Sequence, residues 1–516
     1  MPDSPDDKEA ANNESVYPEL TGLLAEPGSP AEAKAQVVAE SSTSVKGDVT
    51  AFESTSWRGP FFQISAAAMA SLSSVAIGFI TGYSSLVLPQ LVNDTSIDYD
   101  YQRDAHWIAS LPSITSIFGS LVGGVIMEKI GPRTTLLVTA IPCILSWGFV
   151  AFAQTVLLMN VGRCLTGIFL GIYSPVPQVY ATEIADPKYR GMMGAFPEAA
   201  VALGSMLCYI IGNSVDWRTL AILSALVPGV PLFLAMIPLP ESPQWLTKMG
   251  KLQKAEQSVK RFRGPGYDAL AEVTMIRKNI VQKDGADITI KEQLKLFRLP
   301  QNWKPILLVF LVFMCGQFSG FAVVVNYTVI IFDAANTGID SVTSTMIVGS
   351  VRFLTTLLSA VLLDRVGRRP LLIISAIGSS LGMLSIGIFF YLQDTGADVE
   401  NLGWLPLASL LLYVFFNELG YGPIPWLLSG ELIPLAVRTL GNGVAVTAYS
   451  LFAFIISLTF PMMLKMFTTY TTFWLYATFS LSGVALTMFL PETKGKTLEE
   501  IEEFFEPKQE KRQHAL

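Results

Sequence analysis

The chain has 516 residues, of which 51% are hydrophobic and 15% are charged, and its mean hydropathy is +0.47. An average soluble domain carries about 25% charged residues, so this composition excludes an ordinary soluble protein and indicates a multi-pass membrane protein. The net charge of −7 arises in the first 58 residues, which hold 11 acidic and 4 basic side chains. The rest of the chain is therefore balanced and offers no basic surface for a nucleic acid.

Those first 58 residues are rich in Ser, Glu, Pro and Ala, which predicts a disordered cytoplasmic tail. They contain no apolar core of a cleavable signal peptide, so the first membrane span is expected to direct insertion. The stretch SVYPELTGLLAEP (15–27) holds two overlapping patterns that resemble tyrosine-type and dileucine-type sorting signals. They predict sorting adaptors as partners and an endosomal or lysosomal membrane as the alternative to the cell membrane, although such short patterns also arise by chance. The residues concerned are Tyr17, Glu19, Leu20, Leu23 and Leu24.

Twelve apolar runs follow, each able to supply the roughly 20 residues that a membrane-spanning helix needs. We therefore predict an all-α membrane protein with twelve transmembrane helices and with both termini on one face of the membrane. The predicted spans are 62–90, 106–127, 134–153, 156–180, 193–214, 218–238, 305–332, 342–363, 370–392, 404–429, 440–464 and 470–490.

Basic residues predict which face is cytoplasmic, because short cytoplasmic loops carry an excess of Lys and Arg. The short loops after spans two, four, eight and ten are rich in them, whereas those on the other face hold only Arg103, Arg218 and Lys465. The first set of loops, and with them both termini, are predicted to be cytoplasmic. The basic residues of that set are Lys129, Arg133, Lys188, Arg190, Arg365, Arg368, Arg369 and Arg438.

Three motifs of the first half of the chain recur at matching places in the second half. A duplicated six-span unit around a central pathway is typical of secondary transporters. The repeated motifs are MEKIGPRTTLL (127–137) with LDRVGRRPLLI (363–373), Glu183 and Arg190 with Glu431 and Arg438, and IPLPESPQWL with MFLPETKGKTL. We predict a tail at 1–58, a six-helix bundle at 59–238, a cytoplasmic helical linker at 239–303, a second bundle at 304–490 and a cytoplasmic tail at 491–516.

Six motifs make a specific combination: GRCLTG (162–167), VYATEIADPKYRG (179–191), PESPQWL (240–246), DRVGRR (364–369), GPIPW (422–426) and PETKGKTLEEIE (491–502). The set resembles the sugar porters of the major facilitator superfamily, in particular facilitative glucose transporters and insect trehalose transporters. The resemblance covers about residues 60–505. It implies the major facilitator fold, in which two six-helix bundles rock about a central site.

The resemblance also implies a role for charged residues at the cytoplasmic helix ends. In sugar porters such residues form ion pairs that latch the cytoplasmic side while the outer side is open. The alternative is that the basic loops only anchor the topology. One loop departs from the family pattern, because it reads EKIGPR instead of containing a Gly-Arg-Arg run. The predicted gating residues are Glu183, Arg190, Asp364, Arg365, Arg368, Arg369, Glu431 and Arg438.

A substrate site is implied in spans five, seven, eight, ten and eleven. Glu198 stands where glucose transporters carry a sugar-binding glutamine, and Arg352 stands where they often have asparagine. In span seven the family's amide pattern is reduced, because Gly316 and Ala322 replace two of its polar side chains. The predicted substrate-binding residues are Glu198, Gln317, Asn326, Arg352, Glu418, Trp426 and Tyr449.

Glu198 and Arg352 are charges within predicted spans of opposite halves. Isolated charges are costly in a bilayer and mark functional sites, so we expect the two to form a switchable ion pair across the central pathway. The alternative is a static pair that only joins the bundles. Proton-driven sugar porters place an acid in span one, where this chain has Ile80 in GFITGY (78–83). That difference favours passive transport, although Glu198 leaves proton coupling open.

Enzyme chemistry is not indicated. KGKT (494–497) lacks the first glycine of a phosphate-binding loop, and His106 and His514 form no cluster for a metal or a nucleophile. The four cysteines fall within predicted spans without paired spacing, so we expect no disulfide framework. Asn93, in an Asn-Asp-Thr sequon of the first outer loop, is a predicted glycosylation site.

These patterns together predict a facilitative transporter of hexoses or trehalose that works by alternating access, as a uniporter and a monomer, without a cofactor. Three alternatives stay open. They are a proton-coupled sugar carrier, an organic-anion carrier that uses Arg352, and a sensor that binds sugar but scarcely moves it.

Overall fold

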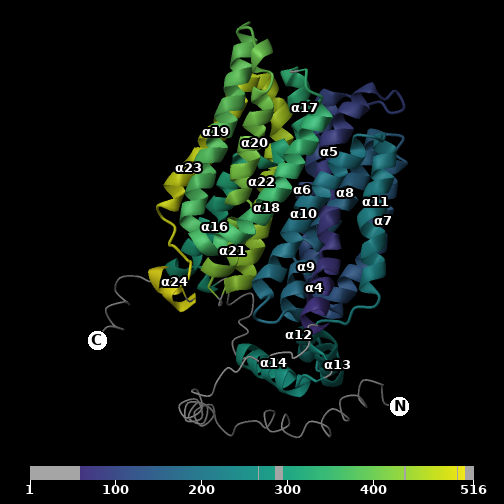
Figure 1. Ribbon diagram of the computed structural model, residues 1–516, viewed down its shortest axis with the longest axis vertical. Coiled ribbons are helices and arrows are strands. Elements are labelled where there is room, and N and C mark those ends of the chain that lie inside the picture. Colours follow the sequence, from purple (N-terminus) through teal and green to yellow (C-terminus); the bar gives the residue numbers. More distant parts are fainter. Residues whose placement is uncertain are drawn as a thin grey trace.

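The computed structural model describes residues 58–264, 266–284, 295–336, 338–434, 437–496 and 498–505. The predicted sorting residues of the N-terminal tail lie outside these ranges, and so does the side chain of Asp364. Long, roughly aligned helices form one bundle, and short helices gather at one end of it (Figure 1). We name this end, where α12–α14 and α24 lie, the linker end, and the opposite one the far end.

Helices α4 to α11 form what we name the first half. Glycine and proline set several of the helix boundaries, as at Gly131, whose φ of 91° ends α6 and precedes Pro132 at the start of α7. The helices are α4 (Arg58–Ala70), α5 (Leu72–Asn93), α6 (Tyr101–Ile130), α7 (Pro132–Ala151), α8 (Val156–Tyr173), α9 (Val176–Ile184), α10 (Arg190–Gly212) and α11 (Trp217–Met236).

Helices α16 to α23 form the second half, and α24 (Leu498–Phe505) follows it. The span predicted at 305–332 is broken at Gly320, which has a φ of 99°. A Cβ there would lie 3.0 Å from Met383 and 3.1 Å from the ring of Tyr476, so glycine is required both by conformation and by packing. The helices are α16 (Pro300–Phe318), α17 (Phe321–Ala335), α18 (Ser341–Val366), α19 (Arg368–Asp394), η2 (Glu400–Leu402), α20 (Leu405–Leu419), α21 (Ile424–Leu432), α22 (Arg438–Met466) and α23 (Thr469–Thr487).

Eleven helices or runs of joined helices in the described part of the chain are long and apolar enough to cross a membrane. They coincide with the first eleven predicted spans. The twelfth predicted span, 470–490, corresponds to α23, which packs along α19 but is not among the eleven. Its sequence, TYTTFWLYATFSLSGVALT, contains five threonines and two serines, which lower its hydropathy.

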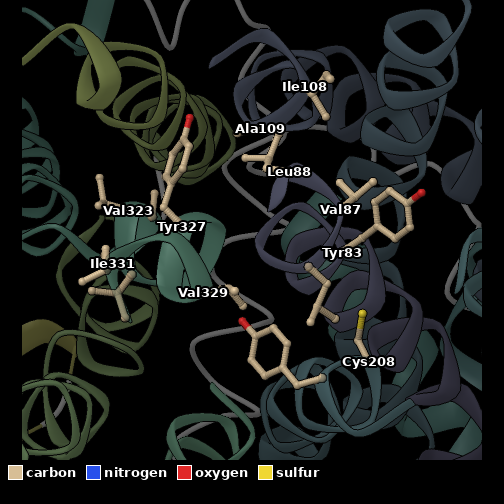
Figure 2. Close-up of a cluster of buried hydrophobic side chains, with 14 of the residues drawn as sticks. Tyr83, Val87, Leu88, Ile108, Ala109, Cys208, Val323, Tyr327, Val329 and Ile331 are labelled. Atoms are coloured by element: carbon tan, nitrogen blue, oxygen red, sulfur yellow. The ribbon is translucent and has the colours of Figure 1, made fainter. Parts of the chain in front are cut away.

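Among the described residues, the two halves touch mainly through three pairs of helices, α5 with α17, α6 with α22, and α10 with α18. A buried apolar cluster near α5, α6 and α17 includes Tyr83, Leu88, Ile108, Val323 and Tyr327 (Figure 2). The far end of the molecule, where α5 and α17 meet (Figure 1), is therefore closed by apolar packing between the halves.

Three polar contacts reinforce this packing between the halves. The hydroxyl of Ser85 accepts from the backbone N–H of Val329 at 3.2 Å. The hydroxyl of Tyr209 donates to the carbonyl of Val325 at 3.2 Å. Ser116 and Ser450 join α6 to α22, with 2.9 Å between their hydroxyl oxygens.

The linker helices α12 (Pro243–Lys248) and α13 (Leu252–Arg263) pack on the first half, and α14 (Ala269–Asp284) packs on α12 and α13. The segment predicted as a helical linker, 239–303, contains these three helices. Arg263 is the main polar contact, because its guanidinium pairs with Asp186 at 3.0 Å and with Glu272 at 2.9 Å. Burial by itself would lower the pKa of Arg263, but these carboxylates hold it above its ordinary value. Gln63 of α4 also donates to Asp186, so α13, α14 and α4 meet at one network.

Candidate functional site

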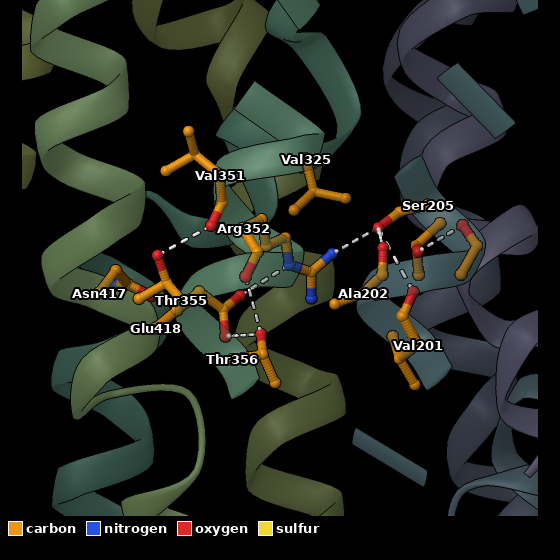
Figure 3. Close-up of polar contacts among 12 residues, drawn as sticks. Val201, Ala202, Ser205, Val325, Val351, Arg352, Thr355, Thr356, Asn417 and Glu418 are labelled. Atoms are coloured by element: carbon orange, nitrogen blue, oxygen red, sulfur yellow. Dashed lines mark hydrogen bonds and ion pairs between the residues drawn. The ribbon is translucent and has the colours of Figure 1, made fainter. Parts of the chain in front are cut away.

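A buried ion pair lies at the centre of the second half. Arg352 of α18 donates through Nε to Oε1 of Glu418 on α20 at 2.6 Å, and both side chains are almost fully buried (Figure 3). The hydroxyl of Thr356, one turn after Arg352, lies 3.5 Å from Oε2 of Glu418. Burying two charges is tolerable only where they are paired and hydrogen-bonded, and both conditions are met.

Arg352 also links the two halves. Its Nη1 donates to the hydroxyl of Ser205 on α10 at 3.1 Å (Figure 3). The guanidinium stands over the ring of Phe321, 5.1 Å from its centroid. One side chain thus contacts its own half through Glu418 and the opposite half through Ser205.

The predicted pair of Arg352 with Glu198 is wrong for this conformation, because Glu418 is the partner. Glu418 belongs to the neighbouring helix of the same half, while α10 presents Ser205 to the guanidinium. Glu198 precedes Ser205 by seven residues, which is two helical turns on the same face, about 10 Å towards the linker end. It is half-buried and still close enough for its charge to interact with those of Arg352 and Glu418.

Gln317 and three aromatic residues from α16, α21 and α22 gather beside these charges. Trp426 and Tyr449 have ring centroids 5.1 Å apart, and Phe313 lies 4.9 Å from Trp426. The side chain of Gln317 interacts with the hydroxyl of Tyr449, which lies near Glu198. The carbonyl oxygen of Gln317 is buried and has no hydrogen-bond partner among the described residues. It is an acceptor that a ligand could satisfy.

Asn326 is placed differently from the other predicted substrate-binding residues. Its Nδ2 donates to the hydroxyl of Ser457 on α22 at 3.0 Å, and the side chain is buried. The amide therefore joins α17 to α22 within the second half.

Arg163, in GRCLTG, is a buried cation that the sequence reasoning did not single out. Its Nη1 donates to the carbonyl of Ile80 at 3.0 Å, its Nη2 to the hydroxyl of Ser84 at 2.6 Å, and its Nε to the carbonyl of Ile108 at 3.1 Å. These partners are neutral, and they come from α5 and α6. An arginine inside an apolar run was the available signal, since such a charge is rarely placed there without a function.

A family model described as "Sugar (and other) transporter" matches residues 66–505. The chain belongs to this sugar transporter family. It is 36% identical to the facilitated trehalose transporter Tret1-2 homolog of Drosophila sechellia, over 87% of this chain and 92% of that protein. It is 35% identical to the facilitated trehalose transporter Tret1 of Culex quinquefasciatus, over 86% of this chain and 85% of that protein.

Solved structures of sugar transporters share the fold. The inward open conformation of the xylose transporter XylE from E. coli superimposes with a TM-score of 0.72 at 26% identity, over 86% of this chain and all of that one. A partially occluded inward open conformation of the same transporter gives a TM-score of 0.71 at 25% identity, over 84% of this chain. The resemblance to the sugar porters of the major facilitator superfamily is thus confirmed.

In this sugar porter the repeated motifs make equivalent contacts in the two halves. Glu241 accepts from the backbone N–H groups of Arg133 and Thr134 at the start of α7, both at 2.9 Å. Glu492 does the same for Arg368 and Arg369 at the start of α19, at 3.1 and 3.0 Å. Each carboxylate therefore caps the helix that follows the repeated glycine loop.

The equivalence extends to the neighbouring side chains. Arg133 donates to the carbonyls of Met236 and Ile237 at the end of α11, and Arg369 donates to the carbonyl of Thr487 at the end of α23. Ser242 donates to Glu183, and Thr493 donates to Glu431.

The halves differ at one position of this network. Arg368 pairs with Glu431 at 2.8 Å, whereas the first half of this sugar porter has Pro132 in the place of Arg368. Glu183 consequently forms no ion pair within the described part of the chain. The departure seen in EKIGPR therefore removes one arginine–glutamate pair from the linker end.

The contacts shown for the predicted gating residues stay within one half. Arg438 donates to the carbonyls of Gly430 and Ile433, and Arg190 and Arg365 are exposed. Asn93, the predicted glycosylation site, is exposed at the end of α5. It lines a pocket of about 280 Å³ at the far end together with Tyr101 of α6 and Asp333 of α17.

Proposed function

We propose that this chain is a facilitative carrier of a hexose or of trehalose that works by alternating access. Its family, and relatives named as facilitated trehalose transporters, support sugar as the substrate class. The residues proposed to contact the sugar are Glu198, Gln317, Trp426 and Tyr449. Arg352 and Glu418 hold the centre together, and Asn326 supports it through Ser457.

The surroundings of Arg163 carry the proposal that transport is passive. A proton-coupled carrier needs a titratable group that is exposed to both sides in turn. The position where proton-driven sugar porters place their acid is Ile80, which is fully buried, and Arg163 bonds to its carbonyl oxygen instead of to a carboxylate. Arg163 stays protonated, and its three neutral acceptors satisfy its hydrogen bonds in that state. The contacts of Arg163 in the first half therefore require no proton to bind or leave during transport.

We propose the topology of twelve spans with both termini in the cytoplasm, divided as two bundles with a cytoplasmic linker. Arg133 binds a carbonyl at the end of α11, and Arg369 binds one at the end of α23 in the same way. This equivalence of α11 and α23 supports α23 as the twelfth span. The basic loops after the even-numbered spans support a cytoplasmic linker end. The protein would then reside in the cell membrane or an endosomal membrane as a monomer.

The arrangement of the halves supports an inward-facing state. Contacts between the halves involve α5, α6 and α10 with α17, α22 and α18, while α9 and α21 pack against their own halves or the linker helices. We propose that Glu183, Arg190, Glu431 and Arg438, with the basic residues of 364–369, approach one another across the halves only when the far end opens.

The test is uptake of labelled glucose and trehalose into proteoliposomes, with and without an inward proton gradient. Uptake that equilibrates and ignores the gradient is expected. Accumulation driven by the gradient would contradict the uniport mechanism, and an absence of flux for both sugars would contradict sugar transport. Protein-free liposomes measure leakage.

A proton-coupled carrier is the second candidate, and Glu198 is the observation that favours it. This carboxylate has no ion pair among the described residues, so it is the group that a proton would use. The organic-anion alternative is disfavoured, since the charge of Arg352 is already balanced by Glu418. A sensor would bind sugar in the same site without flux.

A further inference from the structure

The centre of the molecule holds two carboxyl groups and one guanidinium. Glu198, Arg352 and Glu418 lie close enough for their charges to interact. Arg352 is committed to Glu418 at 2.6 Å and to Ser205 at 3.1 Å. Glu418 therefore balances the charge of Arg352, and Glu198 has no ion pair among the described residues.

An unbalanced carboxylate at this depth is costly, because neither lipid nor the surrounding helices replace the water that would solvate it. A mobile positive group is the simplest way to balance it. Glu198 lies on the linker side of the contact between Arg352 and Ser205, so a ligand arriving from the linker end meets Glu198 before it meets that contact.

Besides Arg352 and Glu418, Tyr449 lies near Glu198, and Gln317 and Trp426 contact Tyr449. An ionised carboxylate only accepts, and the carbonyl oxygen of Gln317 is an acceptor without a partner. Trp426 and Tyr449 are half-buried, and Tyr449 is electrostatically coupled to Glu198. Carboxylates beside Trp and Tyr rings are suited to an ammonium group, which is attracted by the charge and by the ring faces.

We propose that the preferred substrate is an amino sugar, a hexosamine whose protonated amino group faces Glu198. The proposal rests on the proposed function of sugar transport and narrows its substrate class. The hydroxyl groups of the same sugar would donate to the carbonyl oxygen of Gln317. A neutral hexose fits the same space but leaves Glu198 unbalanced.

The rival counter-charge is a proton on Glu198 itself. The charged or titratable groups facing Glu198 are Arg352 of α18, Glu418 of α20 and Tyr449 of α22. If a proton balances the carboxylate, glucose uptake responds to a proton gradient and amino sugars gain no advantage.

The experiment is competition against uptake of labelled glucose in proteoliposomes at about pH 6.5, below the usual pKa of an amino group. The competitors are glucosamine, unlabelled glucose and N-acetylglucosamine, which has the same nitrogen without its charge. We expect glucosamine to compete at concentrations about 10-fold lower than the other two, a difference of about 1.4 kcal/mol. Labelled glucosamine should also be taken up.

Glu198→Gln is the deciding variant, because it keeps the shape and removes the charge. It should lose the 10-fold preference for glucosamine, so that glucosamine and unlabelled glucose inhibit its glucose uptake at equal concentrations, whatever the rate of that uptake. Glu400→Gln, at an exposed acid of η2, is the matched control and should keep the preference. Thermal unfolding in detergent shows whether each variant is folded.

The outcomes separate the two proposals. Glucose flux without any preference for glucosamine in the unmodified protein overturns this inference and leaves sugar transport standing. A preference that survives Glu198→Gln also overturns it, as does glucose accumulation driven by a proton gradient. No flux for any sugar overturns the proposed function, and the inference with it.

Discussion

At the scale of single residues, the two amides of α16 and α17 have different tasks although both were predicted to bind substrate. The carbonyl of Gln317 is buried without a partner, while the amide of Asn326 is bonded to Ser457. An unsatisfied acceptor gains a hydrogen bond when a ligand arrives, whereas a satisfied amide gains little.

We predict that Gln317→Ala raises the KM for sugar about 10-fold, which corresponds to the loss of about one good hydrogen bond. Asn326→Ala should change KM less than about 3-fold and should lower the melting temperature, because Ser457 loses its partner. Uptake kinetics and thermal unfolding in detergent measure the two effects. The reverse order of KM effects would show that Asn326, not Gln317, contacts the sugar.

Substitutions of Arg352 and of Glu418 should have non-additive effects on the free energy of unfolding. Arg352→Gln leaves Glu418 buried and unpaired, and removing one partner of such a pair costs about 3–5 kcal/mol. Arg352→Gln combined with Glu418→Gln should recover much of that loss, since no charge is then left unpaired. A double-mutant cycle on thermal unfolding tests this.

The exposed pair of Lys248 and Glu128, at 3.1 Å, is the matched control for that cycle. Its loss should cost less than about 1 kcal/mol. If the double variant at the centre is as unstable as the sum of its single variants, the pair does not act as a unit.

At the scale of elements, the carboxylates of the two Pro-Glu motifs serve as distant helix caps. Glu241 and Glu492 follow α11 and α23, respectively, and bind the first N–H groups of α7 and α19. The repeated glycines leave room for them, since a Cβ at Gly131 would lie 2.6 Å from the carboxylate carbon of Glu241. Sequence repetition predicted the equivalence of these motifs, but only folding shows that each acid bonds to a backbone so far away in the chain.

We predict that Glu492→Gln lowers stability by about 1 kcal/mol at neutral pH, the usual value of a helix cap. Burial would raise the pKa of Glu492, but the backbone N–H groups of Lys494, Arg368 and Arg369 outweigh it and hold this pKa below its usual range. Because the folded state has the lower pKa, the contribution is complete above the unfolded pKa of about 4.3 and is lost as pH falls through the folded pKa.

The melting temperatures of the unmodified protein and of Glu492→Gln should therefore differ at pH 7 and converge below about pH 4. Glu400→Gln, which lies in an exposed turn, should show no such convergence. A constant difference down to low pH would mean that the shape of the side chain, and not its charge, supports α19.

At the scale of the whole molecule, the contact between Ser116 and Ser450 shows that α6 of one half and α22 of the other lie against each other in this conformation. Both hydroxyls are buried, and 2.9 Å separates them. Alternating access requires that the contacts between the halves exchange, because a ligand site between them is reached from one side at a time.

We predict that the double variant Ser116→Cys and Ser450→Cys forms a disulfide on oxidation and loses sugar uptake until a reductant is added. The hydroxyl oxygens are already 2.9 Å apart, so cysteine sulfurs at these two positions would lie close together. Each single variant controls for the four native cysteines, which are free in this structure. Full uptake with the cross-link formed would show that α6 and α22 do not separate during transport.

Much of this architecture could be predicted from hydropathy and repetition. Runs of about 20 apolar residues indicate membrane-spanning helices regardless of how those helices pack. The span predicted at 342–363 accordingly corresponds to α18 at Ser341–Val366. The breaks within spans were harder to predict. Gly320 interrupts a continuous apolar run, and its φ of 99° together with the crowding by Met383 and Tyr476 explains why glycine stands there.

The sequence could suggest which residues belong to the candidate site, but not which of them form ion pairs. Position in the family pattern placed Arg352, Glu418 and Glu198 in one predicted site, and their charges lie close enough to interact. Whether Arg352 pairs with Glu198 or with Glu418 depends on how α18 is rotated when it packs against its neighbours. That rotation is set by tertiary packing, which the sequence pattern does not show. Arg163 was missed because its acceptors are backbone carbonyls, which every sequence has.

The charges at the centre also bear on membrane voltage. With Glu198 ionised, the empty centre carries one net negative charge, and a cationic substrate makes it neutral. A full charge crossing a membrane exchanges about 2.3 kcal/mol per 100 mV with the field, and the rocking of the halves moves the centre through part of that field. Voltage would then act on the return of the empty carrier rather than on the loaded step. The resting potential of a cell would set how quickly the carrier resets, while the step that moves the sugar would be indifferent to it.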